Sequence, residues 1–275
     1  MKLAIDLGGT NIRIAQVEDG KILSKKSVSC FSSGTEEQVL SQLFSLIGSM
    51  MNEQVIGIGI GVPSVVNHIK GIVYNVTNIP SWKEVHLKDI LQNKFPVQVS
   101  VNNDSNCFVL GEKLYGEGKQ FKNLVGVTLG TGVGAGVIMN DQLYCGDNTG
   151  AGEIGSLPYL DSDFEHYCSS YYFVHYYNTT GREACMDAIN NDSNALNIWR
   201  EFGKHLGELV KVILYTYDPT AIVFGGSISA AFSFFIDSLR ETIADFPYAN
   251  SLNNLHLLST KATDISLLGA SALIP

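Results

Sequence analysis

The sequence predicts an α/β protein built from two related domains. Two observations lead to this prediction. The first half alternates strand and helix patterns in the order β-β-β-α-β-α-β-α, which is typical of an α/β fold. The stretch from Asn123 to Tyr144 then echoes the one from Lys2 to Leu23: a strand, a Leu-Gly turn with Thr, a second strand and a turn containing Asp. The two stretches share few identities, so a chance likeness of two common hairpins is the alternative.

The first half begins with three strand patterns separated by Gly-Gly-Thr and Asp-Gly turns, namely residues 2–9, 11–19 and 21–30. A helix is expected within residues 32–52, where apolar residues recur at helical spacing. Its capping box is formed either by Ser33 with Glu36 or by Thr35 with Gln38. A buried strand, a second strand and a helix follow at residues 55–64, 97–104 and 105–116.

The second half continues after its hairpin with a polar, aromatic segment that reaches about Asn194. A long helix over 195–218 should end at Asp218-Pro219, because proline cannot continue a helix. The remaining patterns are a strand, a helix, a strand and a final helix at residues 220–226, 229–246, 255–260 and 264–274. Gly and Lys residues within 112–122 mark the expected domain boundary.

Composition excludes several classes of function. The chain has 275 residues, 45% of them hydrophobic, and a net charge of −9, so we expect a globular protein that binds neither nucleic acid nor an anionic membrane. The N-terminus shows no signal peptide, and no apolar run has spanning length, which predicts a cytoplasmic protein without membrane contact. Five scattered cysteines predict reduced thiols.

Three glycine turns each follow a strand pattern, at residues 6–10, 129–136 and 224–229. Backbone N–H groups in such turns can approach and bind an anion. Steric needs of ordinary turns are the alternative for any single one. No Gly-Lys-Ser/Thr is present, and residues 130–136 lead into a strand where a Rossmann turn needs a helix. A bound nucleotide is therefore expected between the two domains.

Five segments in this order resemble the ROK group (repressor, open reading frame, kinase) of the sugar kinase/actin/Hsp70 ATPase superfamily. They are "AIDLGGTNIR", "VNNDSNCFVLGE", "TLGTGVGAGVIMND", "GAGEIG" and "IVFGGSIS". The resemblance covers essentially the whole chain. It implies two ribonuclease H-like (actin-like ATPase) domains with an interdomain cleft for ATP-Mg²⁺ and a hexose.

The implied domains are residues 1–115 and 116–264, with a sugar-pocket segment at 150–175. A C-terminal helix at about 265–275 should pack back onto the first domain. Repressors of the group carry a further helix-turn-helix domain at the N-terminus. This chain begins at the phosphate motif, so no such domain is expected.

Asp104 matches the catalytic base of the family. Transfer to a sugar hydroxyl needs a carboxylate that accepts the proton as the oxygen attacks. A helix N-cap is the alternative role for Asp104. Asp6 matches the residue that holds Mg²⁺ through water, with a turn-initiating Asp as its alternative. The matched nucleotide-binding residues are Gly8, Gly9, Thr10, Gly130, Thr131, Gly132, Gly225, Gly226 and Ser227.

For the sugar, the resemblance implies a polar set made of Asn78, Asn103, Asp104, Glu153, Ser156 and Glu165. Ser156 stands where the family has a His that binds both sugar and zinc, and the zinc cysteines are missing, so no zinc site is expected. Aromatic packing should replace the zinc, through Phe164, Tyr167, Tyr171, Tyr172 and Phe173. Trp82 should support the Asn78 loop from its apolar side.

The function implied is ATP-dependent phosphorylation of a hexose or N-acetylhexosamine, with glucose or N-acetylmannosamine favoured. A catalytically inactive sugar-binding regulator of the same fold is the alternative. An actin-like ATPase that needs no sugar is a third hypothesis, disfavoured by the presence of Asn103, Asp104 and Glu153 together. The resemblance also implies a homodimer.

Overall fold

A computed structural model describes residues 1–147 and 150–275. The chain divides into two compact units. Unit 1 comprises residues 1–119, 143–151 and 262–275, and unit 2 comprises residues 120–142 and 152–261. The chain first passes from one unit to the other after Lys119.

Unit 1 contains a five-stranded sheet in the order β3-β2-β1-β4-β8. Its strands are β1 (Lys2–Leu7), β2 (Asn11–Glu18), β3 (Lys21–Ser29), β4 (Gly57–Val62) and β8 (Gln98–Asn103). β1, β2 and β3 pair antiparallel, whereas β1, β4 and β8 are parallel. The carboxyl ends of these three parallel strands therefore lie at one edge of the sheet.

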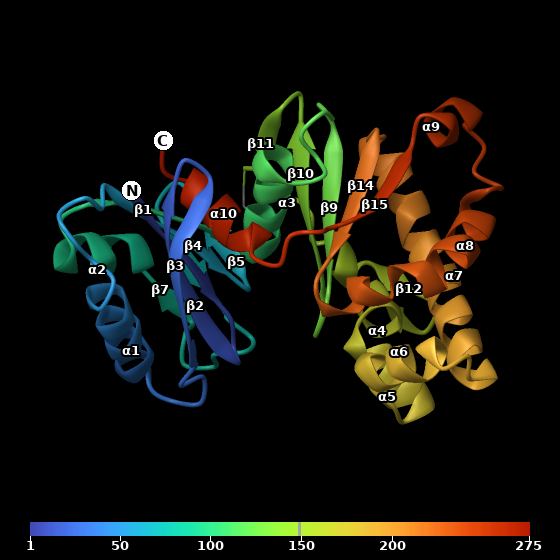
Figure 1. The fold of residues 1–275 in the computed structure, drawn as a ribbon, viewed down its shortest axis with the longest axis horizontal. Helices are drawn as coiled ribbons and strands as arrows, with labels where there is room; N and C mark the ends of the chain where they lie inside the picture. The colour runs from blue at the N-terminus through green and yellow to red at the C-terminus, as the bar shows by residue number, and fades with distance from the viewer. Residues whose placement is uncertain (148–149) are drawn as a thin grey trace. The chain divides into compact units, whose positions relative to one another are not determined.

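Helices cover both faces of this sheet (Figure 1). α1 (Glu36–Gly48) and α2 (Leu87–Lys94) share one buried cluster with Leu3, Ile5 and Leu7 of β1. α3 (Asp104–Tyr115) and α10 (Ile265–Ala272) share another with Ala4. This alternation along β1 is the period of two that a strand imposes on its side chains.

Unit 1 settles which of the two predicted capping boxes forms, and it contains a small sheet that the sequence did not predict. Thr35 and Gln38 form the capping box of α1, so the first of the two predicted pairs, Ser33 with Glu36, is wrong. A three-stranded sheet of β5 (Val65–Asn67), β6 (Ile72–Tyr74) and β7 (Glu84–Val85) was not predicted, because strands of two or three residues are too short to show alternation. Trp82 is fully buried in the adjoining core, as expected.

Unit 2 contains β10, β9, β14 and β15 of a five-stranded sheet in the order β11-β10-β9-β14-β15, and the short strand β11 begins at the last residue of its first segment. Its strands are β9 (Leu124–Leu129), β10 (Val133–Met139), β11 (Gln142–Tyr144), β14 (Ala221–Gly225) and β15 (His256–Ser259). β9 and β10 form an antiparallel hairpin, and β14 runs parallel to both β9 and β15. Both sheets thus combine an antiparallel hairpin with parallel strands.

The helices α7 (Ser193–Tyr217) and α8 (Phe232–Ile243) contribute to the core of unit 2, and α9 (Ala249–Asn253) follows. α7 ends where Asp218 adopts a left-handed conformation with φ of 41° before Pro219, as predicted. Among the described residues no helix combines the length and apolarity needed to cross a membrane.

The polar, aromatic segment before α7 folds into more regular structure than the sequence predicted. It forms η1 (Ile154–Ser156), β12 (Pro158–Tyr159), β13 (Ser162–Asp163), α4 (Phe164–Cys168), α5 (Ser170–Tyr177) and α6 (Gly181–Ile189). Asp163, Ser169 and Thr180 cap the three helices. Helices of five to nine residues show too little periodicity to be recognised from sequence.

The aromatic packing predicted for this segment is largely confirmed. Phe164, Tyr167, Tyr172 and Phe173 are buried in the core of unit 2. Tyr171 is the exception, because its side chain is 41% exposed and stacks on His175 with ring centroids 4.8 Å apart.

Candidate functional site

The predicted residues of unit 1 gather at the carboxyl edge of its parallel strands. Asp6 lies at the end of β1 and pairs with Gly61 of β4, while Asp104 follows the last residue of β8. Cys107, one turn into α3, lies below this edge. Burial raises the pKa of its thiol well above the usual value, and the negative charges of Asp104 and Asp6 raise it further. Both carboxylates therefore lie within electrostatic range of one buried thiol.

Asp104 is the first residue of α3 and does not cap it. The N-cap is Asn103, whose Oδ1 accepts hydrogen bonds from the backbone N–H of Ser105 at 2.8 Å and of Asn106 at 3.3 Å. The alternative prediction that Asp104 serves as the cap is therefore wrong. The Asp104 carboxylate also accepts from the Ser105 N–H, at 2.7 Å. Its position in the first turn of α3 is one where the helix dipole stabilises negative charge.

Asn103 has a structural role that the sequence interpretation did not include. Besides capping α3, it donates from Nδ2 to the carbonyl oxygen of Ser64 at 3.1 Å. Behind it, the buried Asn102 accepts from the Asn103 N–H at 2.8 Å and from the Asn106 side chain at 2.9 Å. The start of α3 is thus fixed by a buried amide network.

Asp6 forms an ion pair with Arg13, a residue absent from the predicted set. Arg13 donates to Asp6 Oδ2 from Nε at 3.0 Å and also from Nη2. Arg13 Nη1 lies 4.0 Å from Asp264, which in turn lies 2.8 Å from Lys25. Residues 6 and 13 stand directly opposite each other in the β1–β2 ladder. Counting across the Gly-Gly-Thr turn of this hairpin is the sequence signal that would have found Arg13.

The residues near Asp6 fit a magnesium ion that is held mainly by a nucleotide. Both hydrogen bonds from Arg13 fall on Oδ2, and Oδ1 makes none among the described residues. No group of three or more His, Cys, Asp or Glu side chains in residues 1–147 and 150–275 could hold a metal alone. Mg²⁺ commonly binds through one or two carboxylates, with waters and substrate phosphates as its other ligands. Oδ1 of Asp6 is sufficient for the protein's part of such a site.

The first glycine turn lies directly against the predicted sugar loop of unit 1. The Gly8 N–H donates to the Asn11 carbonyl at 2.9 Å, which closes the turn. A Cβ atom on Gly9 would lie 2.3 Å from the Cβ of Asn78. Thr10 is exposed at the end of the turn. The structure therefore brings Asn78 and the Gly8–Thr10 turn together.

The other two glycine turns meet in unit 2. The turn between β9 and β10 is closed by a hydrogen bond of 3.0 Å from the Gly130 N–H to the Gly132 carbonyl, and Thr131 is exposed at its tip. Gly225 pairs with Thr128 of β9, which places the two turns at one edge of the sheet. Gly226 has φ of 84°, and a Cβ there would lie 2.2 Å from the Leu129 carbonyl oxygen. Ser227 Oγ would lie 4.0 Å from a Cβ on Gly130.

Glu153 and Glu165 lie near each other in unit 2. Glu153 directly precedes η1, and Ser156 is exposed at the end of η1. Partial burial raises the pKa of Glu153, and the negative charge of Glu165 raises it further. Glu165 Oε2 accepts a hydrogen bond of 3.0 Å from the backbone N–H of Val133. A predicted sugar residue thus binds the backbone directly after the predicted phosphate turn.

The His and Cys side chains of the aromatic segment contact neighbouring polar and aromatic groups. His166 Nδ1 lies 2.6 Å from Asp163, which also caps α4. Cys168 is fully buried, and burial raises the pKa of its thiol. His205 was not among the residues predicted for this aromatic packing. It lies 3.1 Å from the hydroxyl of Tyr159 and contacts the rings of Tyr167 and Tyr172.

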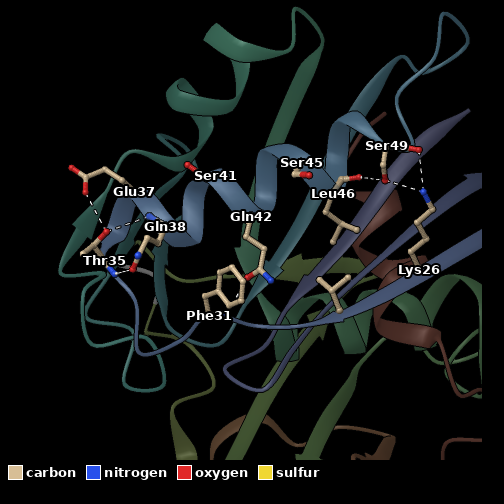
Figure 2. Close-up of a pocket in the computed structure, with 11 residues that line it drawn as sticks. Lys26, Phe31, Thr35, Glu37, Gln38, Ser41, Gln42, Ser45, Leu46 and Ser49 are labelled. Carbon is tan, nitrogen blue, oxygen red and sulfur yellow. Dashed lines mark hydrogen bonds between the residues drawn. The ribbon is translucent and has the colours of Figure 1, made fainter.

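A cavity of about 820 Å³ lies between α1 and β3, and its lining includes none of the predicted site residues. Figure 2 shows that its polar side chains mostly contact one another or the adjacent backbone. Gln42 accepts from the Phe31 N–H at 2.9 Å and donates to the Ser29 carbonyl at 2.7 Å, and Lys26 donates to Ser49 at 2.9 Å. These polar groups stabilise the local structure, so the cavity does not compete with the predicted site.

Comparisons with known proteins support the family that the five sequence motifs resemble. The sequence profile of the ROK family matches residues 2–275. The glucokinase of Thermotoga maritima is 28% identical over an alignment of 309 residues, which covers 99% of this chain and 96% of that protein. The xylose repressor of Bacillus subtilis is 30% identical over 236 residues, which covers 80% of this chain and 61% of the repressor.

A solved structure shows the same fold. The crystal structure of a ROK family glucokinase from Streptomyces griseus, in complex with glucose and AMPPNP, superposes with a TM-score of 0.84. It is 24% identical, and the match covers 99% of this chain and 98% of that one. At this identity the likeness establishes the fold alone, which is the predicted actin-like ATPase fold.

Proposed function

The chain belongs to the ROK family over residues 2–275, and on this premise we propose that it transfers the γ-phosphoryl group of ATP to a hydroxyl of a hexose or N-acetylhexosamine. Glucose and N-acetylmannosamine are the favoured acceptors. The observation that carries the proposal is the placement of Asp104. It stands at the carboxyl edge of β1, β4 and β8, on the far side of β4 from the Asp6 strand. Asn103 performs the capping role that would otherwise explain an Asp there.

In the proposed reaction the Asp104 carboxylate accepts the proton of the sugar hydroxyl. The hydroxyl oxygen forms a bond to the γ-phosphorus, the bond from that phosphorus to the bridging oxygen breaks, and its electron pair leaves with ADP. An ordinary Asp has a pKa of about 3.9 and is a weak base. Proton transfer late in a loose transition state makes this sufficient, since positioning and charge neutralisation supply most of the acceleration.

The glycine turns supply backbone N–H groups for the phosphate tail, apart from the N–H groups of Gly8 and Gly130, which close the turns themselves. Gly8 to Thr10 serve this role in unit 1 and Gly130 to Gly132 in unit 2, while Gly225 to Ser227 form the adenosine side. Asp6 would hold Mg²⁺ through water, and that ion, when bound, would neutralise charge on the phosphates. Arg13 orients the Asp6 carboxylate through its two hydrogen bonds to Oδ2.

Asn78, Asn103, Glu153, Ser156 and Glu165 are the proposed sugar contacts. Carboxylates and amides suit this role because a hexose presents several hydroxyl donors at fixed angles. Ser156 can still form a hydrogen bond, although its side chain is shorter than the His that the family has there. A homodimer remains a prediction from the family resemblance, and a cytoplasmic location remains a prediction from the sequence itself.

A sugar-binding regulator is the second candidate, and the match to the Bacillus subtilis xylose repressor favours it. The kinase must turn over ATP, whereas a regulator only has to bind sugar. A regulator therefore needs no catalytic base. The presence of Asp104, Asp6 and two phosphate turns in one chain favours the kinase.

The test is ADP release, coupled to an indicator enzyme, from purified protein with ATP-Mg²⁺ and a panel of hexoses and N-acetylhexosamines. Asp104→Asn should lower sugar-dependent turnover by about 10²- to 10⁴-fold. Glu201→Gln, a half-buried carboxylate of α7, is the matched control and should keep wild-type turnover.

Sugar-dependent turnover that Asp104→Asn leaves unchanged would refute the assigned base. Sugar binding without turnover across the panel would support the regulator. ADP release that needs no sugar would revive the actin-like ATPase hypothesis.

A further inference from the structure

We infer that Glu165 is a positioning residue for the phosphate turn at residues 130–133, in addition to any contact it makes with a sugar. The inference rests on the proposed function and deepens it. It assigns to one side chain of the sugar segment a direct influence on nucleotide affinity, within unit 2 alone.

The contact between Glu165 and the turn has two parts. Glu165 Oε2 accepts a hydrogen bond of 3.0 Å from the Val133 N–H, at the point where the turn enters β10. A Cβ atom on Gly132 would lie 2.3 Å from the same oxygen, and its three nearest neighbours would all be Glu165 atoms. Gly132 therefore provides the space that the carboxylate occupies.

A second bond ties the same segment to the other end of the turn. The Ser170 N–H, at the first residue of α5, donates to the Gly130 carbonyl at 2.8 Å. Residues 165–170 thus hold the turn at two points, since they donate a hydrogen bond to Gly130 and accept one from Val133. Two attachments fix the turn's orientation better than one, because a single bond leaves it free to rotate.

Glu165 itself is held in place by the short helix that carries it. Asp163 accepts from the His166 N–H at 2.9 Å and so fixes the start of α4. Phe164, Tyr167 and Cys168 anchor the helix in the core, with exposures of 4%, 8% and 0%. Glu165 is the exposed member of this helix, and its carboxylate is directed at the turn.

The physical consequence concerns the cost of ordering the turn. A glycine-rich segment loses more conformational freedom than other segments when it is fixed around a phosphate. A charged acceptor on a backbone N–H makes a stronger bond than a neutral one. By ordering the turn before the nucleotide arrives, Glu165 lowers the entropy lost on binding.

The experiment measures the affinity for AMPPNP-Mg²⁺ by calorimetry without sugar, and the affinity for sugar without nucleotide. Glu165→Ala should weaken nucleotide binding about tenfold, or about 1.4 kcal/mol. Glu165→Gln keeps an oxygen acceptor for Val133 and should stay within about threefold of wild type. Glu201→Gln on α7 is the control carboxylate and should not change either affinity.

A double-mutant cycle with Gly132→Ala tests the contact from the side of the turn. The new methyl group should displace the Glu165 carboxylate, which is the end of a flexible side chain, and weaken nucleotide binding with little change in thermal stability. In the Glu165→Ala background the same substitution should cost no further affinity, because the clashing atoms are gone.

Two results would overturn the inference and leave the kinase proposal intact. One is wild-type nucleotide affinity in Glu165→Ala together with lost sugar affinity, which would make Glu165 a sugar ligand only. The other is additivity of the two substitutions in the cycle. If Glu165→Ala does not fold, unchanged nucleotide affinity in Gly132→Ala overturns the inference on its own. Wild-type protein that binds no nucleotide would overturn both the inference and the proposed function.

Discussion

Replacing Asn103 separates its two assigned roles, the cap of α3 and a sugar contact. The side chain accepts hydrogen bonds from two backbone N–H groups of α3 and donates to the Ser64 carbonyl. Asn103→Ala removes all three bonds, whereas Asn103→Ser keeps a hydroxyl that can cap the helix but cannot reach Ser64. We expect the alanine variant to be the less stable of the two.

The expected magnitude follows from these bonds. Loss of an N-cap costs about 1 kcal/mol, and loss of the hydrogen bond to Ser64 costs about 1 kcal/mol more. The free energy of unfolding should therefore fall by about 2 kcal/mol in Asn103→Ala and by about 1 kcal/mol in Asn103→Ser. At about 2 to 4 °C per kcal/mol, Tm should fall by about 4 to 8 °C and about 2 to 4 °C.

Urea unfolding followed by circular dichroism gives these stabilities, and the KM for the sugar acceptor is measured on the same samples. If Asn103→Ala unfolds at the wild-type midpoint while the KM for sugar rises, the capping argument is refuted and Asn103 is a ligand alone. If stability falls and the KM for sugar is unchanged, Asn103 acts by holding the start of α3.

Three further predictions follow from local geometry and charge. Gly226→Ala should lower the free energy of unfolding by more than about 2 kcal/mol, because its φ is 84° and a Cβ would lie 2.2 Å from a carbonyl oxygen. Gly48→Ala in α1, where a Cβ meets no atom within 4 Å, is the matched control, and equal effects in urea unfolding would contradict the steric argument. Glu153→Gln should raise Tm at pH 7, because the raised pKa of Glu153 means that its ionised carboxylate costs stability in the folded state. This gain in Tm should disappear below pH 4.5, the usual pKa of a Glu carboxyl group, where both states are protonated. A gain that does not depend on pH would contradict this reasoning. Burial lowers the pKa of His205, so the wild type should lose stability as pH falls through the usual value of 6.5, and thermal unfolding of His205→Gln should show a flatter profile.

Much of the fold was accessible from sequence because its signals are short-range. The two hairpins, the parallel strands that follow them and α7 each carry a period of two or 3.6, and most of them are bounded by Gly or Pro. Helices α4 to α6 escaped prediction because they are short. The aromatic residues of α4 and α5 also face a core that forms only when α7 packs against them.

The sequence by itself determined the family, through five motifs in fixed order, and with it the expectation of Asp104 as the base. Only the tertiary structure decided which of two adjacent polar residues caps α3, because Asn103 and Asp104 are equally good caps by chemistry and differ only in backbone position. It also paired Glu165 with Val133. Glu165 and Val133 lie 32 residues apart. Such contacts depend on how whole elements pack, and no local pattern encodes them.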